Sequence, residues 1–414
     1  MMKDIIKEIR ERTLSILDVT KKEIEKGLEL HRKIIVCDSL LACDPIPRSK
    51  RLEAKINELL DKDFPVYDIF RLSIIDEIIM DEMLKNSEVR KEYVDAWKLS
   101  GVTCASQTMP RSGVFTLSDV WKSLSIFHSK LNLFKDVLIK ATCADDIRKA
   151  KEEGKHAIIW NIQNLPSNWG GVDLECELET LDILYGFGLR IVQLTYQFRN
   201  MVGDGCAERY ESGISYFGEK VIEKLNRLGV LIDVSHCGYK TTLDAVELSK
   251  DPIAATHTTC RTVYDHPRGK RDDELQAIAE KGGYIGICAV PAFLGGSGTL
   301  KEWLNHVDYA VNLVGIDHVG IGTDCGYERI PQRLIETMEK KGKDPKGAHW
   351  WSGFWPIKIE TPPQVKKDET ISGSLAWINL PYFTVGLVSR GYSDNEIKKI
   401  MGENFLRIIE RVIG

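Results

Sequence analysis

Short apolar runs recur along the chain, and each gives way to polar residues and then to a longer amphipathic segment. The runs are rich in Val and Ile and nearly continuous in hydrophobicity, which is typical of parallel strands covered on both faces. They lie at 33–39, 101–106, 156–163, 190–196, 230–236, 252–257, 283–290 and 318–324.

The segments between these runs have helical character, and several end in glycine, as helices often do. Eight strand–helix units in one chain predict a (β/α)8 barrel of the TIM type. A doubly wound open sheet is the alternative, but the sequence lacks the glycine-rich phosphate-binding motifs that such sheets often carry. We therefore expect residues 33–414 to form one barrel with inserted loops.

The first 32 residues have apolar positions at roughly helical spacing, and charged residues interrupt every apolar run. This pattern predicts an N-terminal helical extension, 1–32, that packs outside the barrel. It is typical neither of a signal peptide nor of a membrane-spanning helix. We therefore expect no membrane span.

The composition is that of an ordinary globular protein, with 43% hydrophobic residues, 28% charged residues and a formal net charge of -5. This balance gives no electrostatic reason to expect nucleic acid or an anionic membrane as a partner. The ten cysteines are scattered, and none forms a Cys-x-x-Cys pair. Unpaired thiols without a signal peptide predict a cytoplasmic protein without disulfides.

The barrel hypothesis gives the residues at the ends of the runs a shared location, because the active sites of such barrels lie at the carboxyl ends of the strands. His236 and His257 end two consecutive runs, and Asp324 ends the eighth. Histidines and carboxylates that converge from different strands suit a divalent transition metal. The other rim residues are Asp38, Gln163 and Tyr196.

Two of these groups have a second interpretation. Asp324 suits a loop-capping role, but opposite a metal it would orient or deprotonate a water. Arg268 lies on the loop that leaves the run of His257, where its guanidinium is either a plain surface charge or a fork that binds a substrate carboxylate.

Several long segments together resemble the membrane (renal) dipeptidase family of the amidohydrolase superfamily, in order from about residue 33 to the end. They include "GLRIVQLTYQFRN", "LIDVSHCGYKTTLDAVELSKDPIAATHT", "HPRGKRDDELQAIAEKGGYIGI", "VDYAVNLVGIDHVGIGTD" and "RGYSDNEIKKIMGENFLRII". The resemblance implies a (β/α)8 barrel, zinc-centred hydrolysis of dipeptides or similar small amides, and a homodimer. It also implies that His236 and His257 bind one zinc ion and that Arg268 binds the substrate carboxylate.

The sequence departs from the family pattern at three places. The family's Asp-Gly-His-Asn-Asp is "DSLLA" here, so Leu40 and Ala42 replace the ligands of the first metal. The bridging glutamate is Gln163, and the histidine of Leu-Thr-His is Tyr196. The resemblance therefore implies at most one divalent ion, zinc, per chain. Two histidines make a weak site, so a third ligand is needed, for which Asp38, Cys37 and Asp324 are candidates.

These observations predict a mononuclear metal-dependent hydrolase that cleaves a dipeptide or similar small amide with a carboxylate. In it, Asp324 and Tyr196 are catalytic, while Arg268 and Gln163 bind substrate. His236, His257 and Asp38 hold the metal. The alternative is a non-catalytic binding protein on the same barrel, and metal content distinguishes the two.

Overall fold

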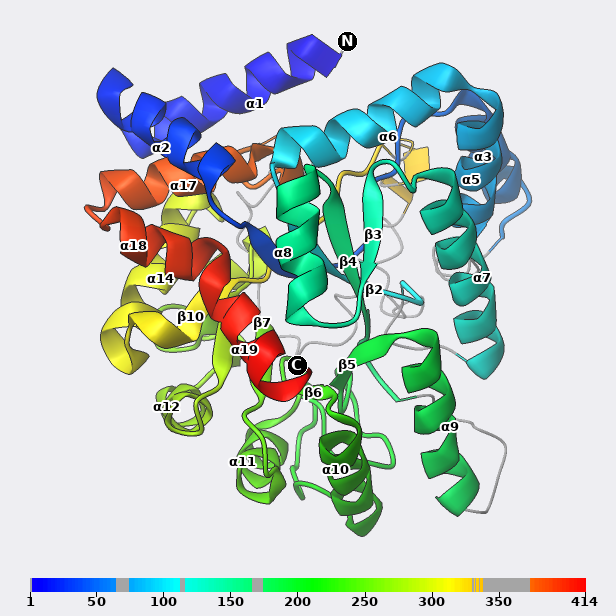
Figure 1. Ribbon diagram of the computed structural model, residues 1–414, viewed down its shortest axis with the longest axis vertical. Coiled ribbons are helices and arrows are strands. Elements are labelled where there is room, and N and C mark those ends of the chain that lie inside the picture. The colour runs from blue at the N-terminus through cyan, green and yellow to red at the C-terminus, as the bar shows by residue number, and fades with distance from the viewer. Residues whose placement is uncertain are drawn as a thin grey trace.

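The eight predicted strands are present and form one parallel sheet that curves into a nearly closed barrel (Figure 1). The computed structural model describes residues 2–64, 74–111, 116–165, 174–329, 331, 333–334, 336–337 and 373–414. The strands follow one another in the order β1 (Cys37–Leu41), β2 (Cys104–Thr108), β4 (His156–Ile162), β5 (Leu189–Gln193), β6 (Leu231–Asp233), β7 (Ala254–Cys260), β9 (Tyr284–Ile287) and β10 (Val319–Ile321). The predicted (β/α)8 barrel is confirmed.

The last strand returns to the first just beyond its own end. Cys325 forms a parallel bridge with Leu41, and the backbone N–H of Asp324 donates a hydrogen bond to the Leu40 carbonyl at 3.0 Å. The seam between β10 and β1 is thus closed at the carboxyl end of the barrel, where the sequence places the site.

The hydrophobic pattern did not predict two short strands. β3 (Leu138–Ala141) pairs with the first half of β4, and β8 (Gly269–Lys270) pairs with the end of β7. β3 has two partly exposed residues and β8 has only two residues in all, so neither produces an apolar run. Both are additions at the side of the barrel strands, and they leave the barrel order unchanged.

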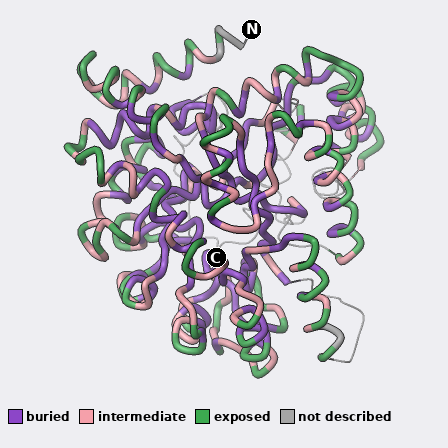
Figure 2. Tube along the Cα trace, in the orientation of Figure 1, coloured by how far each residue is buried: buried purple, intermediate pink, exposed green. Residues whose placement is uncertain are grey.

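Helices cover the outside of the barrel, with their exposed faces turned outward (Figure 2). The described helices are α1 (Met2–Leu17), α2 (Lys21–Lys33), α3 (Lys50–Asp61), α5 (Ile74–Lys85), α6 (Ser87–Ser100), α7 (Leu117–Leu133), α8 (Ala144–Glu153), α9 (Leu174–Phe187), α10 (Tyr216–Leu228), α11 (Tyr239–Leu248), α12 (Asp272–Glu280), α13 (Pro291–Leu294), α14 (Leu300–Val314), η1 (Ile316–His318), η3 (Trp377–Asn379), α17 (Leu380–Ser389), α18 (Asp394–Lys398), η4 (Lys399–Glu403) and α19 (Asn404–Val412). Within these ranges, no helix is both long enough and apolar enough to cross a membrane.

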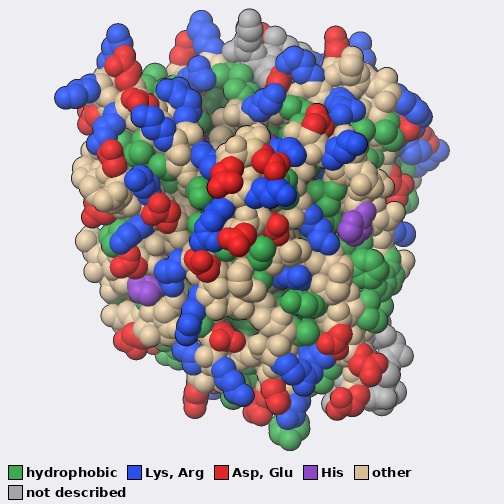
Figure 3. Space-filling view, viewed as in Figure 1, with side chains coloured by type: hydrophobic (Ala, Val, Ile, Leu, Met, Phe, Trp, Pro, Cys, Tyr) green, Lys and Arg blue, Asp and Glu red, His purple; other side chains and the backbone are tan. Residues whose placement is uncertain are grey.

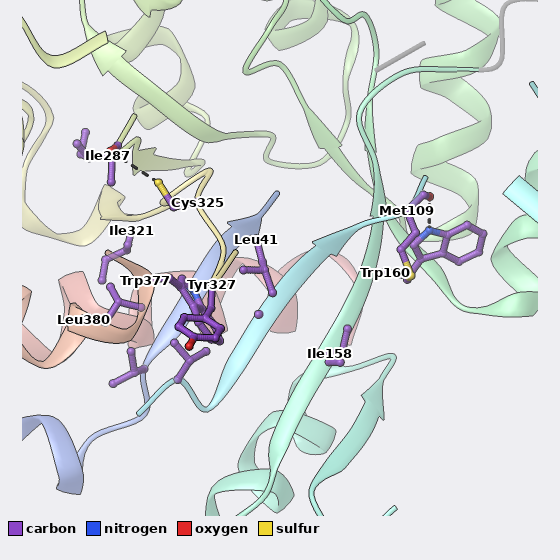
Figure 4. Packing of buried hydrophobic residues seen from close by; sticks show 14 of the residues in the cluster. Leu41, Met109, Ile158, Trp160, Ile287, Ile321, Cys325, Tyr327, Trp377 and Leu380 are labelled. Carbon is purple, nitrogen blue, oxygen red and sulfur yellow. Dashed lines mark hydrogen bonds between the residues drawn. The ribbon is translucent and has the colours of Figure 1, made fainter. Parts of the chain in front are cut away.

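Strand residues alternate between two hydrophobic clusters, because successive side chains of a strand point to opposite faces. On β4, Ile158 and Trp160 belong to the larger cluster, which packs the barrel against its helices (Figure 4). Ala157 and Ile159 belong to a smaller cluster that includes Phe405 of α19. The smaller cluster therefore fills the amino-terminal part of the barrel, and its carboxyl end is left for polar groups.

The first two helices pack against the body of the protein. α2 begins with a capping box at Thr20 and Glu23 and lies along α17, beside which α1 also packs. The division into an extension over residues 1–32 and a barrel over residues 33–414 stays a prediction.

The junction of α2, α6 and α17 contains a buried histidine. His31, which is 2% exposed, has its Nδ1 atom 2.7 Å from the Thr384 hydroxyl and its Nε2 atom 3.0 Å from the Ser100 carbonyl. Because a carbonyl only accepts, Nε2 carries the proton and Nδ1 accepts from the threonine. Burial lowers the pKa of His31 to about 4, since the protonated ring would lose its hydration there.

This pKa predicts acid sensitivity. The unfolded chain protonates His31 near its ordinary pKa of about 6.5, whereas the folded chain resists until about pH 4. The contribution of neutral His31 to the free energy of unfolding is therefore fully present above pH 6.5. It is lost as the pH falls toward 4, which lowers the free energy of unfolding by roughly 3 kcal/mol. We expect His31→Gln to flatten the dependence of the urea-unfolding free energy on pH in this window. His128→Gln, at a partly exposed position, serves as the control, and an equal slope for wild type and His31→Gln would contradict the prediction.

Candidate active site

Two histidines meet at the carboxyl end of the barrel. His236 lies on the loop after β6, and His257 lies within β7, where the register with β9 shifts between Ala255 and Thr258. Both side chains are fully buried, and their Nε2 atoms are 2.9 Å apart. The strand that the sequence predicts to end at His257 continues to Cys260, but the predicted convergence of the two rings is present.

A buried carboxylate sets the tautomer of His257. The Thr256 hydroxyl donates to Asp233 Oδ2 at 2.6 Å, so its oxygen is left to accept from His257 Nδ1, 2.9 Å away. The proton of His257 therefore sits on Nδ1, and its Nε2 lone pair points at His236. Supporting hydrogen bonds of this kind orient histidine ligands in metal sites.

The second histidine is held by stacking. The ring of Tyr196, which follows β5, lies 4.3 Å from the ring of His236 at an interplanar angle of 22°. Burial lowers the pKa of both histidines well below the ordinary value, and the Arg268 cation adds to this effect, so both rings are neutral. His236 Nδ1 is buried and has no hydrogen-bond partner among the described residues.

The histidine pair suits one cation. Two imidazole nitrogens bound to one tetrahedral zinc ion lie about 3.3 Å apart, given metal–nitrogen distances near 2.0–2.1 Å. The observed separation is 2.9 Å, at which His236 donates its Nε2–H to the Nε2 lone pair of His257; a cation that displaced this proton would take both Nε2 lone pairs. However, the described part of the chain contains no group of three or more His, Cys, Asp or Glu side chains placed to hold a metal ion. The structure thus brings two candidate ligands together, and no third His, Cys, Asp or Glu side chain joins them among the residues it describes.

Asp324 occupies the seam between β10 and β1. Its backbone has a left-handed φ of 55°, an uncommon conformation for a residue other than glycine. Burial raises the pKa of its carboxyl to about 7; Arg268 lowers this pKa, while Asp38 and Asp233 raise it. Within the described ranges, no hydrogen bond reaches its side-chain oxygens. Asp324 therefore offers a carboxylate with free lone pairs that can bind a proton near neutral pH.

Asp38 has a different environment from the one that a metal ligand needs. Its Oδ1 atom accepts hydrogen bonds from the backbone N–H groups of Thr323 (2.8 Å) and Leu40 (3.3 Å). Its Oδ2 atom accepts from the Thr323 hydroxyl (2.6 Å) and from Nε1 of Trp377 (3.1 Å). Burial nevertheless raises the pKa of Asp38 to about 7. The carboxylate is fully engaged in joining β1 to the seam and to η3, so its predicted role as a ligand gains no support from this geometry.

The three residues that the sequence analysis assigns to the family's first metal site carry no charged or imidazole group. Leu40 is 1% exposed and belongs to neither hydrophobic cluster, and Ala42 is partly exposed. Gln163 donates from Nε2 to the Thr108 hydroxyl at 2.9 Å, which leaves its neutral carbonyl oxygen as the part that can face a ligand. These residues do not fit a second divalent ion.

Arg268 is a buried cation behind the histidine pair. It is 1% exposed and donates to the carbonyls of Ser235 (2.6 Å) and His257 (2.9 Å), while its Nε–H is buried without a partner. Nearby Lys270, which is equally buried, has Glu274 at 3.1 Å. Arg268 forms no ion pair with any described residue, so its charge is available to an anionic ligand.

Asp233 and Thr256 are the site residues that sequence reasoning missed. Asp233 accepts hydrogen bonds from the Ser235 and Thr256 backbone N–H groups at 2.9 and 3.0 Å, as well as from their hydroxyls. A signal was present, because a carboxylate inside an apolar strand three residues before a histidine needs buried partners. The sequence did not show that Asp233 orients His257, because this contact depends on the pairing of β6 with β7.

Solved structures share the barrel over nearly the whole chain. An amidohydrolase from Pseudomonas aeruginosa is 27% identical, with a TM-score of 0.68, and the match covers 94% of this chain and 99% of that one. A probable dipeptidase PvdM from the same organism is 20% identical, with a TM-score of 0.67 and coverage of 95% and 99%. The fold is that of the amidohydrolase and dipeptidase barrels.

The model of the membrane dipeptidase family, peptidase family M19, matches residues 85–341, and the chain belongs to this family. It is 24% identical over 302 residues to dipeptidase verJ of Clonostachys rogersoniana and 29% identical over 202 residues to an uncharacterized dipeptidase of Schizosaccharomyces pombe. These matches cover 72% and 46% of this chain, and the chain spans 66% and 46% of the two relatives.

The hydrogen-bond chain from Asp233 to His257 gives a test of the site's construction. We expect Thr256→Val to lower the free energy of unfolding by about 1–3 kcal/mol, because it leaves Asp233 and the His257 ring short of a partner in a buried site. Thr256→Ser, which keeps the hydroxyl, should retain most of the stability. Urea denaturation of the three proteins measures the effect. Equal stability of wild type and Thr256→Val would show that the hydrogen bonds of the Thr256 hydroxyl do not stabilise the fold.

Proposed function

We propose that this chain is a hydrolase that cleaves a dipeptide or a similar small amide bearing a free carboxylate, using one divalent ion. The observation that carries this proposal is the pair of neutral, buried histidines whose Nε2 atoms point at each other across 2.9 Å. Membership of the dipeptidase family supports the reaction type. A metallopeptidase of the same fold from Rhodobacter sphaeroides is liganded with a phosphinate mimic of the dipeptide L-Ala-D-Ala, which supports the substrate class.

His236 and His257 would hold the ion, and zinc suits two imidazole ligands. When bound, such an ion polarises a substrate carbonyl and lowers the pKa of a water molecule. A second ion would meet Leu40, Ala42 and the neutral amide of Gln163. Its charge would be poorly compensated in a buried place, at a cost of several kcal/mol, so we infer one ion per chain.

Arg268 would bind the substrate carboxylate. Its guanidinium is buried and forms no ion pair with a described residue, although its charge lowers the pKa of Asp324, so a bound carboxylate would supply a direct counter-charge. Because Arg268 also bonds to the carbonyls of Ser235 and His257, the bound substrate would be positioned relative to the histidine pair.

Asp324 would take a proton during hydrolysis or complete the ligand set. Its carboxylate is free of hydrogen bonds to described residues, and burial keeps its affinity for a proton high. Tyr196 and Gln163 retain polar groups at two positions where the family has charged or basic ones. Stacking of Tyr196 on His236 suggests that its ring also fixes the orientation of that histidine.

A non-catalytic binding protein on the same barrel is the second candidate. It is favoured by the incomplete ligand set, because no third His, Cys, Asp or Glu side chain joins the histidine pair among the described residues. In that case Arg268 would still bind a carboxylate, but no hydrolysis would follow.

Assembly and location are inferred on separate grounds. The family resemblance supports a homodimer. The nine cysteines whose side chains the structure describes are all free thiols, which supports a reducing compartment such as the cytoplasm.

Metal content distinguishes the two candidates. We expect protein purified in metal-replete medium to contain one zinc ion per chain by elemental analysis, and either His236→Asn or His257→Asn to lose it. His128→Asn, at a partly exposed position away from the pair, should keep the ion. Two tightly held ions would contradict the single site, and none would favour the binding protein.

Substrate preference tests Arg268. We expect Arg268→Ala to reduce kcat/KM for a dipeptide by an amount equivalent to about 2–5 kcal/mol, because it removes a buried charged contact. Arg268→Lys keeps the charge but not the two-pronged geometry, so its loss should be intermediate. The control substrate is the same dipeptide with its carboxylate converted to an amide. If Arg268→Ala retained the wild-type preference for the carboxylate form, the assigned role would be wrong.

A further inference from the structure

A second cavity lies away from the histidine pair, between the N-terminal helices and the body of the protein. It has a volume of about 350 Å³, which is within the range of small-molecule sites. Its walls come from α1, α2, α6 and the η3–α17 segment, which lie together across the top of Figure 1. These elements precede β1 and β2 or follow the last barrel strand, and neither histidine of the pair lines the cavity.

The inner surface of this cavity is mainly apolar. Ile9, which is 2% exposed, lines it, and Tyr382, which is 6% exposed, adds an aromatic face and a hydroxyl that can donate a hydrogen bond. The remaining apolar walls are formed mainly by Ile6, Leu28, Leu99 and Ile378. Such a surface binds hydrocarbon because the contact removes apolar area from water.

Three cations surround the apolar surface. Arg10 on α1, Arg32 on α2 and Lys98 on α6 all line the cavity and are exposed, and none of the lining residues that the structure describes is acidic. The same region of Figure 3 carries several basic side chains.

These three cations are unpaired, unlike their neighbours. Within the described ranges, none of the three forms an ion pair or a side-chain hydrogen bond. By contrast, Lys26 and Lys33 on α2 pair with Asp394 and Glu29 at 2.8 and 2.5 Å. No described acidic side chain pairs with these three cations, so an anion bound there would supply a counter-charge.

We propose that this cavity binds a small amphipathic anion of the alkyl carboxylate type. The hydrocarbon tail would lie on the apolar walls formed by α1, α2 and α17, and the carboxylate would lie among Arg10, Arg32 and Lys98. This cavity is separate from the histidine pair. If it bound no such anion, the proposed hydrolase function would be unaffected. The N-terminal extension then supplies one wall of a ligand site as well as packing area.

Calorimetric titration of the full chain with decanoate, below its micelle-forming concentration, tests this proposal. We expect saturable binding of one molecule per chain. Butyrate, which keeps the charge but shortens the tail, and decanol, which keeps the tail without the charge, should each bind at least tenfold more weakly. Saturation by decanol at the same concentration as decanoate would overturn the role of the cations.

Variants of the protein test the contribution of the three cations and that of the apolar walls separately. Arg32→Glu with Lys98→Glu should weaken decanoate binding at least tenfold. Lys250→Glu with Lys301→Glu makes the same change in net charge at exposed positions outside the cavity and should leave binding unchanged. Leu28→Trp, which fills the cavity without changing charge, should also abolish binding, and circular dichroism checks that each variant is folded. Equal affinity in all variants, or no saturable binding by the wild type, would overturn the proposal.

Sedimentation with vesicles distinguishes a free ligand from a membrane surface. Vesicles of phosphatidylcholine with phosphatidylglycerol present anionic headgroups, but their acyl chains are packed away from the surface. We expect decanoate to bind without any retention of the protein on these vesicles. Retention that depends on Arg32 and Lys98, without binding of decanoate, would replace the small-ligand site with a membrane-docking surface.

Discussion

The site depends on how the carboxylate of Asp233 is kept buried. A charge in the interior of a barrel is costly unless hydrogen bonds satisfy it, and Ser235 and Thr256 each supply a backbone N–H and a hydroxyl. These bonds tie the ends of β6 and β7 together and, through the Thr256 hydroxyl, fix the proton of His257. The His257 ring then turns its free nitrogen toward His236, and Arg268 donates to the carbonyls of Ser235, after β6, and His257, within β7. The proposed metal site and the proposed carboxylate site would therefore share one support.

Leu40, Ala42 and Gln163, which the sequence analysis assigns to the family's first metal site, form a consistent set because all three are uncharged. Leu40 and Ala42 offer a cation no ligand, and without a cation a charged side chain at position 163 would lack a counter-charge. A neutral glutamine bonded to Thr108 avoids that cost. The local chemistry thus favours either a complete first site or none, whereas the histidine pair has its own support from Asp233.

The sequence predicted the barrel because its eight strands are nearly continuous apolar runs, whereas β3 and β8 are too short or too exposed to form one. It also predicted the meeting of His236 and His257, because parallel strands bring their carboxyl ends together. The environment of Asp38 could not be predicted. Its partners Thr323 and Trp377 are distant in sequence and meet it only at the closed seam. Such long-range contacts decide whether a carboxylate at the rim faces a ligand or bonds to the protein. They cannot be predicted from the positions at which the strands end.

The seam between β10 and β1 has a consequence for how freely this family can change its chemistry. Asp38 fastens the first strand to Thr323 and Trp377, and Leu40 joins it to Asp324 through backbone atoms. None of these bonds uses the side chains at positions 40 and 42. The architecture therefore does not rely on an ion to stay closed at this point, so ligand positions there can be exchanged for apolar residues without loss of the fold. Apolar residues at positions 40 and 42 are therefore compatible with a barrel that stays closed at this seam.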